Sequence, residues 1–253
     1  MYHKRKGFKK VNVQGLDCWI PPVGKVYNHW TKEIEDVDII QRSTRTKDQW
    51  WEPVDLPVDY KKKRDQETRR QEDDPDYFNP ELESIRRTEW HRRINGVWFM
   101  NNGEPTYITG MHYYYLNYYM MDIGHPNYRE TDRKEFYFLQ YCIEDPNCYG
   151  MLNVTRRRAG KTFKAGCFIL EGISRMKYAN GGIQSKTNPD AKKVFREAIV
   201  SPFRKLPDFF RPVFDMAKGV NPSSELRFFK TVKKGVNSVL EFDADELEST
   251  IDF

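Results

Sequence analysis

Apolar residues recur at intervals of three or four along several stretches of this chain. Such spacing places them on one face of an α-helix, which can then pack against a core. Helices are therefore predicted over 81–93, 129–144 and 161–176, and a further helix begins near Asn188. At that last start, Asn-Pro-Asp supplies a capping side chain, a proline for the first turn and an acid near the positive helix end.

Short runs of large apolar residues between these helices predict strands. A hairpin is expected where 97–100 is followed by Asn101-Asn102-Gly103 and then by 107–109, because Asn-Gly adopts the positive φ angles of a tight turn. Further strands are predicted over 149–154, 182–185, 226–229 and 236–242. Strands that alternate with helices are typical of parallel β-α-β units, so the sequence predicts a three-layer α/β domain with a mainly parallel sheet.

The run 113–121 is almost entirely aromatic or apolar. Stacked aromatic rings can bind single-stranded bases. Large residues without polar interruption more often fill a core, however, because aromatic side chains bury much apolar surface. We therefore expect this run to be buried.

The composition narrows the class of protein. The chain has 253 residues, with 42 Lys and Arg against 37 Asp and Glu, and 38% hydrophobic residues, so a folded core is expected and collagen-like or wholly disordered classes are excluded. It contains neither an apolar run long enough to span a bilayer nor an export signal behind its basic start. The four cysteines form no C-x-x-C pair, which argues against a metal held by Cys and His.

Residues 1–93 differ in character from the rest and are predicted to form an irregular α+β appendage. Prolines interrupt much of this segment, and a basic block at 61–64 precedes an acidic one at 72–76. The basic block is interpreted as a solvated helix face, with phosphate contact as the alternative. Residues 94–253 are predicted to form the second domain.

The sharpest local signal is the octapeptide Thr155–Thr162, which ends in Gly-Lys-Thr as a phosphate-binding loop does. In such a loop Gly160 lets backbone N–H groups surround the phosphates, Lys161 reaches the terminal phosphates, and Thr162 offers its hydroxyl to Mg²⁺. Thr155 stands where the standard pattern has glycine. The predicted strand before the loop and the predicted helix after it strengthen the assignment.

The loop also carries three consecutive arginines, Arg156, Arg157 and Arg158. Neighbouring like charges repel, and a polyphosphate would relieve that repulsion. The alternative is a basic turn that faces solvent.

The loop resembles the altered Walker A motif of large terminase subunits, the ATPases that package DNA in tailed phages. Upstream, Arg133–Gln140 resembles the adenine-recognising Gln motif of that family, and 109–117 resembles terminases of crAss-like and related phages. Downstream, 182–185 and 206–212 resemble the segment that follows Walker A in these proteins. The resemblance covers about residues 95 to 253.

This resemblance implies a P-loop NTPase (RecA-like) sheet that uses ATP and Mg²⁺ to drive double-stranded DNA into a procapsid. Gln140 would contact adenine, and Thr162 would bind Mg²⁺. Arg157 and Lys161 would be the catalytic residues, with Arg157 as the arginine trigger. The nucleotide-binding set is then Gln140, Thr155, Arg156, Arg157, Arg158, Ala159, Gly160, Lys161 and Thr162. An ordinary exposed helix position is the alternative for Gln140.

One departure from the family concerns Walker B. The nearest candidate is 239–243, but Glu241 interrupts its apolar run, and the acidic residues after it are more typical of a solvated turn. In the family, Walker B would come after 251–253. We therefore expect the chain to stop within the ATPase domain, before Walker B and the nuclease domain, so that it binds nucleotide but hydrolyses it poorly.

The resemblance also implies partners and a location. It predicts double-stranded DNA, a portal protein, a small terminase subunit and a homo-oligomeric ring as partners, no membrane association, and a place in the host cytoplasm, transiently at the procapsid portal. Two alternatives are another P-loop nucleic-acid ATPase, such as a helicase or translocase, and a non-enzymatic nucleic-acid-binding virion protein with a chance Gly-Lys-Thr.

Overall fold

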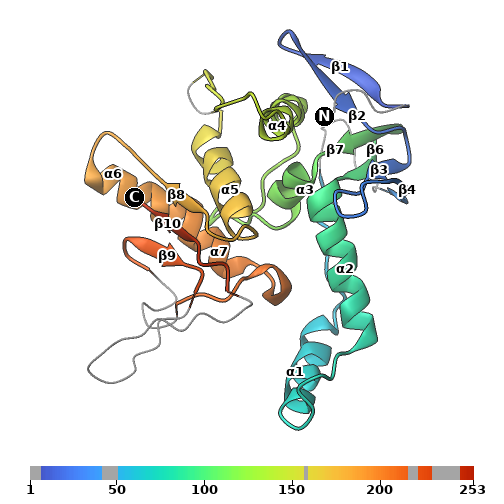
Figure 1. The fold of residues 1–253 in the computed structure, drawn as a ribbon, viewed down its shortest axis with the longest axis vertical. Coiled ribbons are helices and arrows are strands. Elements are labelled where there is room, and N and C mark those ends of the chain that lie inside the picture. Colours follow the sequence, from blue (N-terminus) through green and yellow to red (C-terminus); the bar gives the residue numbers. More distant parts are fainter. Residues whose placement is uncertain (1–6, 42–50, 157–158, 216–221, 230–245) are drawn as a thin grey trace. The chain divides into compact units, whose positions relative to one another are not determined.

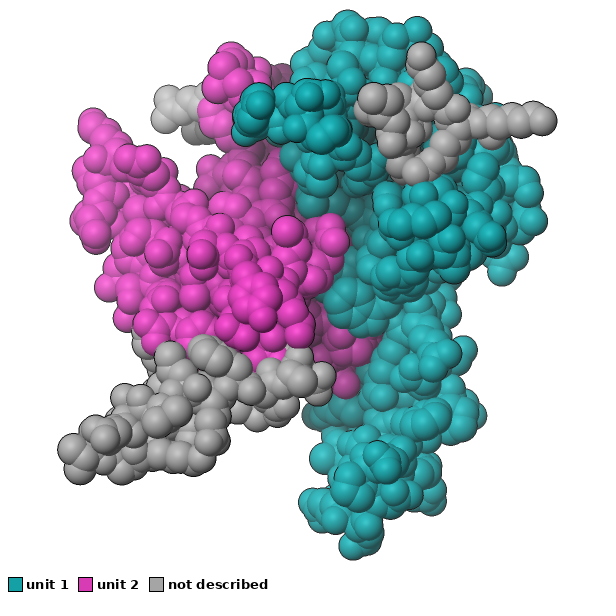
Figure 2. Space-filling model, in the orientation of Figure 1, with its two compact units in different colours: residues 1–113, 127–151 teal, residues 114–126, 152–253 magenta. Residues whose placement is uncertain are grey.

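The computed structural model describes residues 7–41, 51–156, 159–215, 222–229 and 246–253 (Figure 1). The chain forms two compact units (Figure 2). Unit 1 contains residues 1–113 and 127–151, and unit 2 contains residues 114–126 and 152–253. These units are a division by packing. The functional division at residue 93 stays a prediction.

The described residues of unit 1 form three small β structures. The strands β1 (Lys9–Val13) and β2 (Leu16–Ile20) form one antiparallel hairpin, and β3 (Lys25–Tyr27) and β4 (Ile34–Asp36) form another. The third is a sheet in the order β5-β6-β7, in which β5 (Ile39–Ile40) is parallel to β6 (Val97–Asn101). Side chains from these strands and from α4 (Glu130–Glu144) form a shared core of Val13, Cys18, Ile20, Val26, Trp98, Tyr107 and Tyr137.

The predicted hairpin is confirmed. Strand β6 pairs with β7 (Glu104–Ile108), and the turn between them uses Asn102 at φ 51° and Gly103 at φ 85°. Asn and Gly are the residues that tolerate such angles, so the local sequence sets the register of the two strands.

The helices predicted in unit 1 are also present. The helix α2 runs over Pro80–Asn95 and α4 over Glu130–Glu144, and a shorter α1 (Tyr60–Gln71) contacts α2. Asn79 caps α2 by accepting a hydrogen bond from the Glu81 N–H at 3.0 Å.

Lys61 and Lys62 of the basic block in α1 are exposed, as a solvated helix face requires, while other charged residues join α1 to α2. Glu67 is 3% exposed and accepts two hydrogen bonds from the Arg86 guanidinium of α2, and it also accepts one from the Asn79 N–H at 2.8 Å. Lys63 lies between the carboxylates of Asp59 and Glu81. The bonds of Glu67 and the Lys63–Glu81 pair therefore join α1 to α2 and to the cap of α2.

The aromatic run 113–121 is buried, as expected. It includes most of α3 (Gly110–Asn117), and Tyr113, Tyr114 and Tyr119 are completely inaccessible to solvent. Met120, at 38% exposed, is the exception. Rings shielded in this way are not available to stack on bases, so the structure favours the core interpretation.

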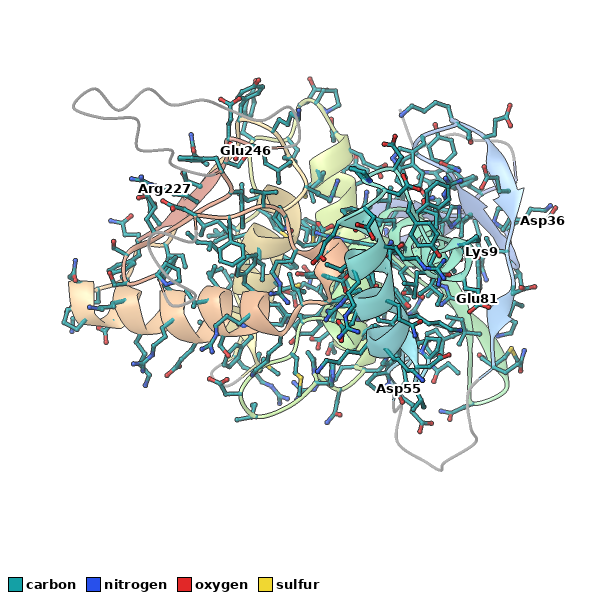
Figure 3. All side chains as sticks on the ribbon, turned by 90° about the horizontal axis from the view of Figure 1, so that it is seen from below. Lys9, Asp36, Asp55, Glu81, Arg227 and Glu246 are labelled. Carbon is teal, nitrogen blue, oxygen red and sulfur yellow. The ribbon has the colours of Figure 1, made fainter. Side chains whose placement is uncertain are left out.

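Unit 2 contains a three-stranded sheet in the order β8-β10-β9. The central strand β10 (Thr250–Asp252) is parallel to β8 (Asn180–Gly182) and antiparallel to β9 (Glu225–Arg227). The helix α5 (Lys161–Ile173), yellow in Figure 1, contacts both β8 and β10. Figure 3 shows Arg227 of β9 and Glu246, ahead of β10, in the same part of this unit.

A long helical segment packs against α5. It consists of α6 (Asn188–Phe195), the π-helical turn η2 (Arg196–Val200) and α7 (Ser201–Lys205), and a 3-10 turn, η3 (Asp208–Phe210), follows it. The predicted helix start is correct to within one residue, because Thr187 and not Asn188 is the cap. Its side chain accepts a hydrogen bond from the Asp190 N–H.

A buried serine holds the start of β10. The hydroxyl of Ser249 donates to the carbonyl of Met176 at 2.6 Å and accepts from the N–H of Ala179 at 2.9 Å. The N–H of Thr250 then donates to the carbonyl of Ala179 at 3.0 Å. These bonds fix the segment that precedes β8 against the segment that precedes β10.

One predicted strand is absent, and the prediction of a mainly parallel sheet also needs correction. Residues 149–154 form no strand: Tyr149, Leu152 and Val154 are 102%, 91% and 86% exposed, and no strand pairs with them in the part of the chain that the structure describes. Large residues support a strand only where a neighbouring strand hydrogen-bonds to them. The sheet is also mixed, since β9 is antiparallel to β10, and the predicted strand 236–242 lies outside the described residues.

Candidate nucleotide-binding loop

The candidate phosphate-binding loop ends where α5 begins. Gly160 is the N-cap of the helix and has φ 73° and ψ 12°, the left-handed conformation that favours glycine. Its carbonyl accepts the first helical hydrogen bond, from the N–H of Lys164 at 3.1 Å. The N–H groups of the first turn of α5 point out of this helix end, as they do in every α-helix.

The first turn of α5 suits an anion. Lys161 and Thr162 are exposed, no side chain among the described residues caps the helix, and its first turn contains no acidic residue. Within the described residues Lys161 forms no ion pair, so its ammonium group is not engaged by a carboxylate there. An open helix N-terminus beside a free lysine is positive and attracts phosphate.

The rest of the octapeptide is only partly described. Thr155, Ala159 and Gly160 are half-buried and Arg156 is exposed. The Oγ1 atom of Thr155 is buried and has no hydrogen-bond partner among the described atoms. The predicted trigger Arg157 and its neighbour Arg158 lie outside the described residues.

Close packing anchors α5 behind the loop. Gly166 faces Ala198 of η2 so closely that a Cβ atom at position 166 would lie 2.7 Å from the Ala198 Cβ. The hydroxyl of Tyr119 donates to the Ala198 carbonyl at 2.6 Å, and its oxygen would lie 2.9 Å from the same added Cβ. The helix that follows the loop is therefore packed closely against η2.

The sequence did not indicate two charged residues that α5 buries. Lys164 is 3% exposed and Glu171 is inaccessible, and Glu171 accepts a hydrogen bond from Arg175 at 2.7 Å. Helical spacing aligns both positions with buried Cys167. Lys164 and Glu171 are seven residues apart with apolar Cys167 between them. This helical spacing is the sequence signal that places the two charged residues on the buried face.

Gln140 lies in unit 1, on α4. Its side-chain nitrogen donates to Oε1 of Glu144, one turn further along the helix. Gln140 is half-buried and lines a narrow hollow whose other walls include Trp19, Tyr107 and Tyr141. Loop residues 155–162 belong to unit 2, whereas Gln140 belongs to unit 1.

The donor groups in the loop fit Mg²⁺–ATP as far as the structure describes them. A threonine hydroxyl at the first turn is a suitable oxygen ligand, and a lysine beside it complements phosphate charge. No cluster of three or more His, Cys, Asp or Glu side chains is placed to hold a metal by itself in the described ranges. Across the same ranges, every helix is too short or too polar to cross a membrane.

No relative supports the assignment of this loop as a nucleotide site. Comparison of the chain with protein-family models, with curated proteins and with solved structures finds no match.

Proposed function

We propose that residues 155–162 bind ATP with Mg²⁺ and that this chain is the ATPase portion of a DNA-packaging motor of the large-terminase type. The observation that carries the nucleotide site is the conformation of Gly160 at the start of α5. It places exposed Lys161 and Thr162 at an uncapped positive helix end. The assignment to a packaging motor rests on the sequence resemblance.

In this proposal each described residue has a separate task. The N–H groups at the start of α5 bind phosphate oxygens, and Lys161 contributes a positive charge to the terminal phosphates. Thr162 provides a hydroxyl ligand for Mg²⁺, which would neutralise phosphate charge when bound. Arg157 is assigned the trigger, and Gln140 the adenine contact, from the resemblance alone.

A fluorescent ATP analogue tests the nucleotide site directly. We expect Lys161→Ala to weaken its equilibrium binding at least tenfold, because the lysine charge is lost from the phosphate site. Lys192→Ala is the matched control, since Lys192 is an exposed lysine on another helix of the same unit. Equal affinity of the wild type and Lys161→Ala would reject the nucleotide site.

Duplex DNA tests the motor assignment separately. We expect double-stranded DNA to alter affinity for the ATP analogue, since binding of the two ligands is coupled in a motor. A chain that bound the analogue but showed no change with DNA would be a nucleotide-binding protein of another kind. A chain that bound DNA but no analogue would support the alternative of a nucleic-acid-binding protein with a chance Gly-Lys-Thr.

A further inference from the structure

The helical segment of α6, η2 and α7 has an apolar side and a basic side. Its apolar side is buried in unit 2, where Phe195, Ala198 and Ile199 are inaccessible to solvent. Figure 3 shows the segment as the long orange helix along one edge of this unit. Four of its cations are exposed, and we call them the basic face: Lys192, Lys193, Arg196 and Arg204.

Most of the charge on the basic face is not balanced within the described part of the chain. The side chains of Lys192 and Lys193 form no ion pair or hydrogen bond with any described residue. The Arg196 guanidinium is 75% exposed and lies 3.9 Å from the carboxylate of Glu197. Helical spacing of three and four residues makes Arg196 a neighbour of both lysines, so the three charges repel one another. An anionic partner would relieve this repulsion.

The basic face lacks the groups that a membrane or a single strand would need. Residues 188–205 contain no exposed large apolar side chain, so the segment has no apolar face to insert into a lipid surface. They also expose no aromatic ring, and such rings are what bind unpaired bases by stacking. The face therefore suits a regular array of phosphates.

We propose that the basic face binds the phosphate backbone of double-stranded DNA without reading its sequence. The helical segment from Asn188 to Lys205 is about 27 Å long, and a duplex carries roughly one negative charge for each 1.7 Å of its axis. Several phosphates therefore lie within the length of this segment. The choice of DNA over RNA rests on the proposed function, whereas the choice of a duplex backbone rests on the surface itself.

Fluorescence anisotropy with a labelled DNA duplex, measured on the whole chain over a range of salt concentrations, tests the proposal. The test variant combines Lys192→Gln, Lys193→Gln and Arg196→Gln. We expect it to bind the duplex at least about tenfold more weakly than the wild type at low salt, because three phosphate contacts are lost. The slope of log affinity against log salt concentration should fall by about 2 to 3, since each contact contributes roughly 0.9.

A second triple variant in α1 separates a local contact from the total charge. Lys61→Gln, Lys62→Gln and Arg69→Gln remove the same three charges from an exposed surface of unit 1. This variant should keep the affinity and the salt slope of the wild type. A larger loss of affinity here than in the α6 variant would place the phosphate contact on α1 and overturn the proposal.

The other outcomes are also decisive. Equal affinity of the wild type and the α6 variant for the duplex would overturn the proposal, as would tighter binding to a single strand or to vesicles that contain an anionic lipid. The α6 variant should bind the fluorescent ATP analogue as the wild type does. A wild type that binds the duplex but not the analogue would reject the nucleotide site and leave the basic face standing. Circular dichroism verifies that both triple variants are folded.

Discussion

The hydroxyl of Tyr119 donates a hydrogen bond of 2.6 Å to the backbone carbonyl of Ala198. In a continuous α-helix that carbonyl would accept from the N–H of residue 202, but residue 202 is proline and has no N–H. The helix widens into the π-turn η2 at this place. Tyr119 therefore supplies the donor that Pro202 removes.

Removal of this hydroxyl should destabilise the protein. Burial raises the pKa of the Tyr119 phenol, so the group remains protonated and acts as a donor. We expect Tyr119→Phe to lower the free energy of unfolding by about 1–3 kcal/mol, the cost of a buried carbonyl without its partner. Urea denaturation measures the change. Tyr149→Phe is the control, because Tyr149 is fully exposed and its loss of a hydroxyl should be neutral.

Two glycines of α5 should respond in opposite directions to the same substitution. A Cβ at Gly166 would lie 2.7 Å from the Ala198 Cβ, so Gly166→Ala should destabilise the fold by about 1–3 kcal/mol through overpacking. No atom lies within 4 Å of a Cβ placed at Gly172, so Gly172→Ala should stabilise it by about 0.5–1 kcal/mol through helix propensity. Thermal unfolding of both variants compares them, and a stabilised Gly166→Ala would contradict the close packing.

The left-handed conformation of Gly160 predicts a strain effect without a steric clash. No atom lies within 4 Å of a Cβ placed at this position, so any penalty comes from the backbone conformation. Gly160→Ala should cost about 1 kcal/mol of unfolding free energy, and Gly160→Asn should cost less, because asparagine tolerates this region better. Denaturation of both variants gives the comparison. Equal stability of the wild type and the alanine variant would contradict the conformation.

The buried carboxylate of Glu67 should make the free energy of unfolding decrease as the pH falls. Burial raises its pKa, but the hydrogen bonds from Arg86 and the Asn79 N–H outweigh that effect, and the net result is a pKa below the ordinary 4.5. The folded state thus binds its proton less readily than the unfolded state. The resulting stabilisation is complete above pH 4.5 and is lost as the pH falls through the folded pKa.

Glu67→Gln tests this assignment. The variant should lose about 3 kcal/mol at neutral pH, because Arg86 then remains half-buried without its carboxylate. Its unfolding free energy should also change less than that of the wild type between about pH 3 and pH 5, a window that includes the ordinary Glu pKa of 4.5. Parallel slopes in this window would show that Glu67 is not responsible.

Local sequence signals predicted much of the secondary structure. The Asn102-Gly103 turn sets the β6-β7 hairpin, and the apolar spacing of α2, α4 and α5 gives their positions within a few residues. These features depend on neighbours close in sequence. The helix cap was placed at Asn188 although Thr187 performs it, because either residue type can cap and only the geometry decides.

Features set by distant contacts could not be predicted in the same way. The apolar run 149–154 has the composition of a strand, yet it is exposed, since composition does not provide a pairing partner. Strand β10 is three residues long, and its place between β8 and β9 depends on segments far away in the chain. For the loop, the helix predicted to begin at residue 161 does begin there, while the roles of Gly160, Gln140 and Arg157 stay predictions.

The boundary between the two units has a practical consequence for dissecting this protein. The chain passes from one unit to the other at 113/114, at 126/127 and at 151/152, so unit 2 is not one continuous stretch. Cleavage within the exposed stretch 149–154 would leave residues 114–126 on the amino-terminal fragment. Those residues supply Tyr119 to Ala198 and the Met121 carbonyl to Lys205, so a carboxyl-terminal fragment expressed alone would miss part of its own interior. Co-expression of both fragments is the way to restore it.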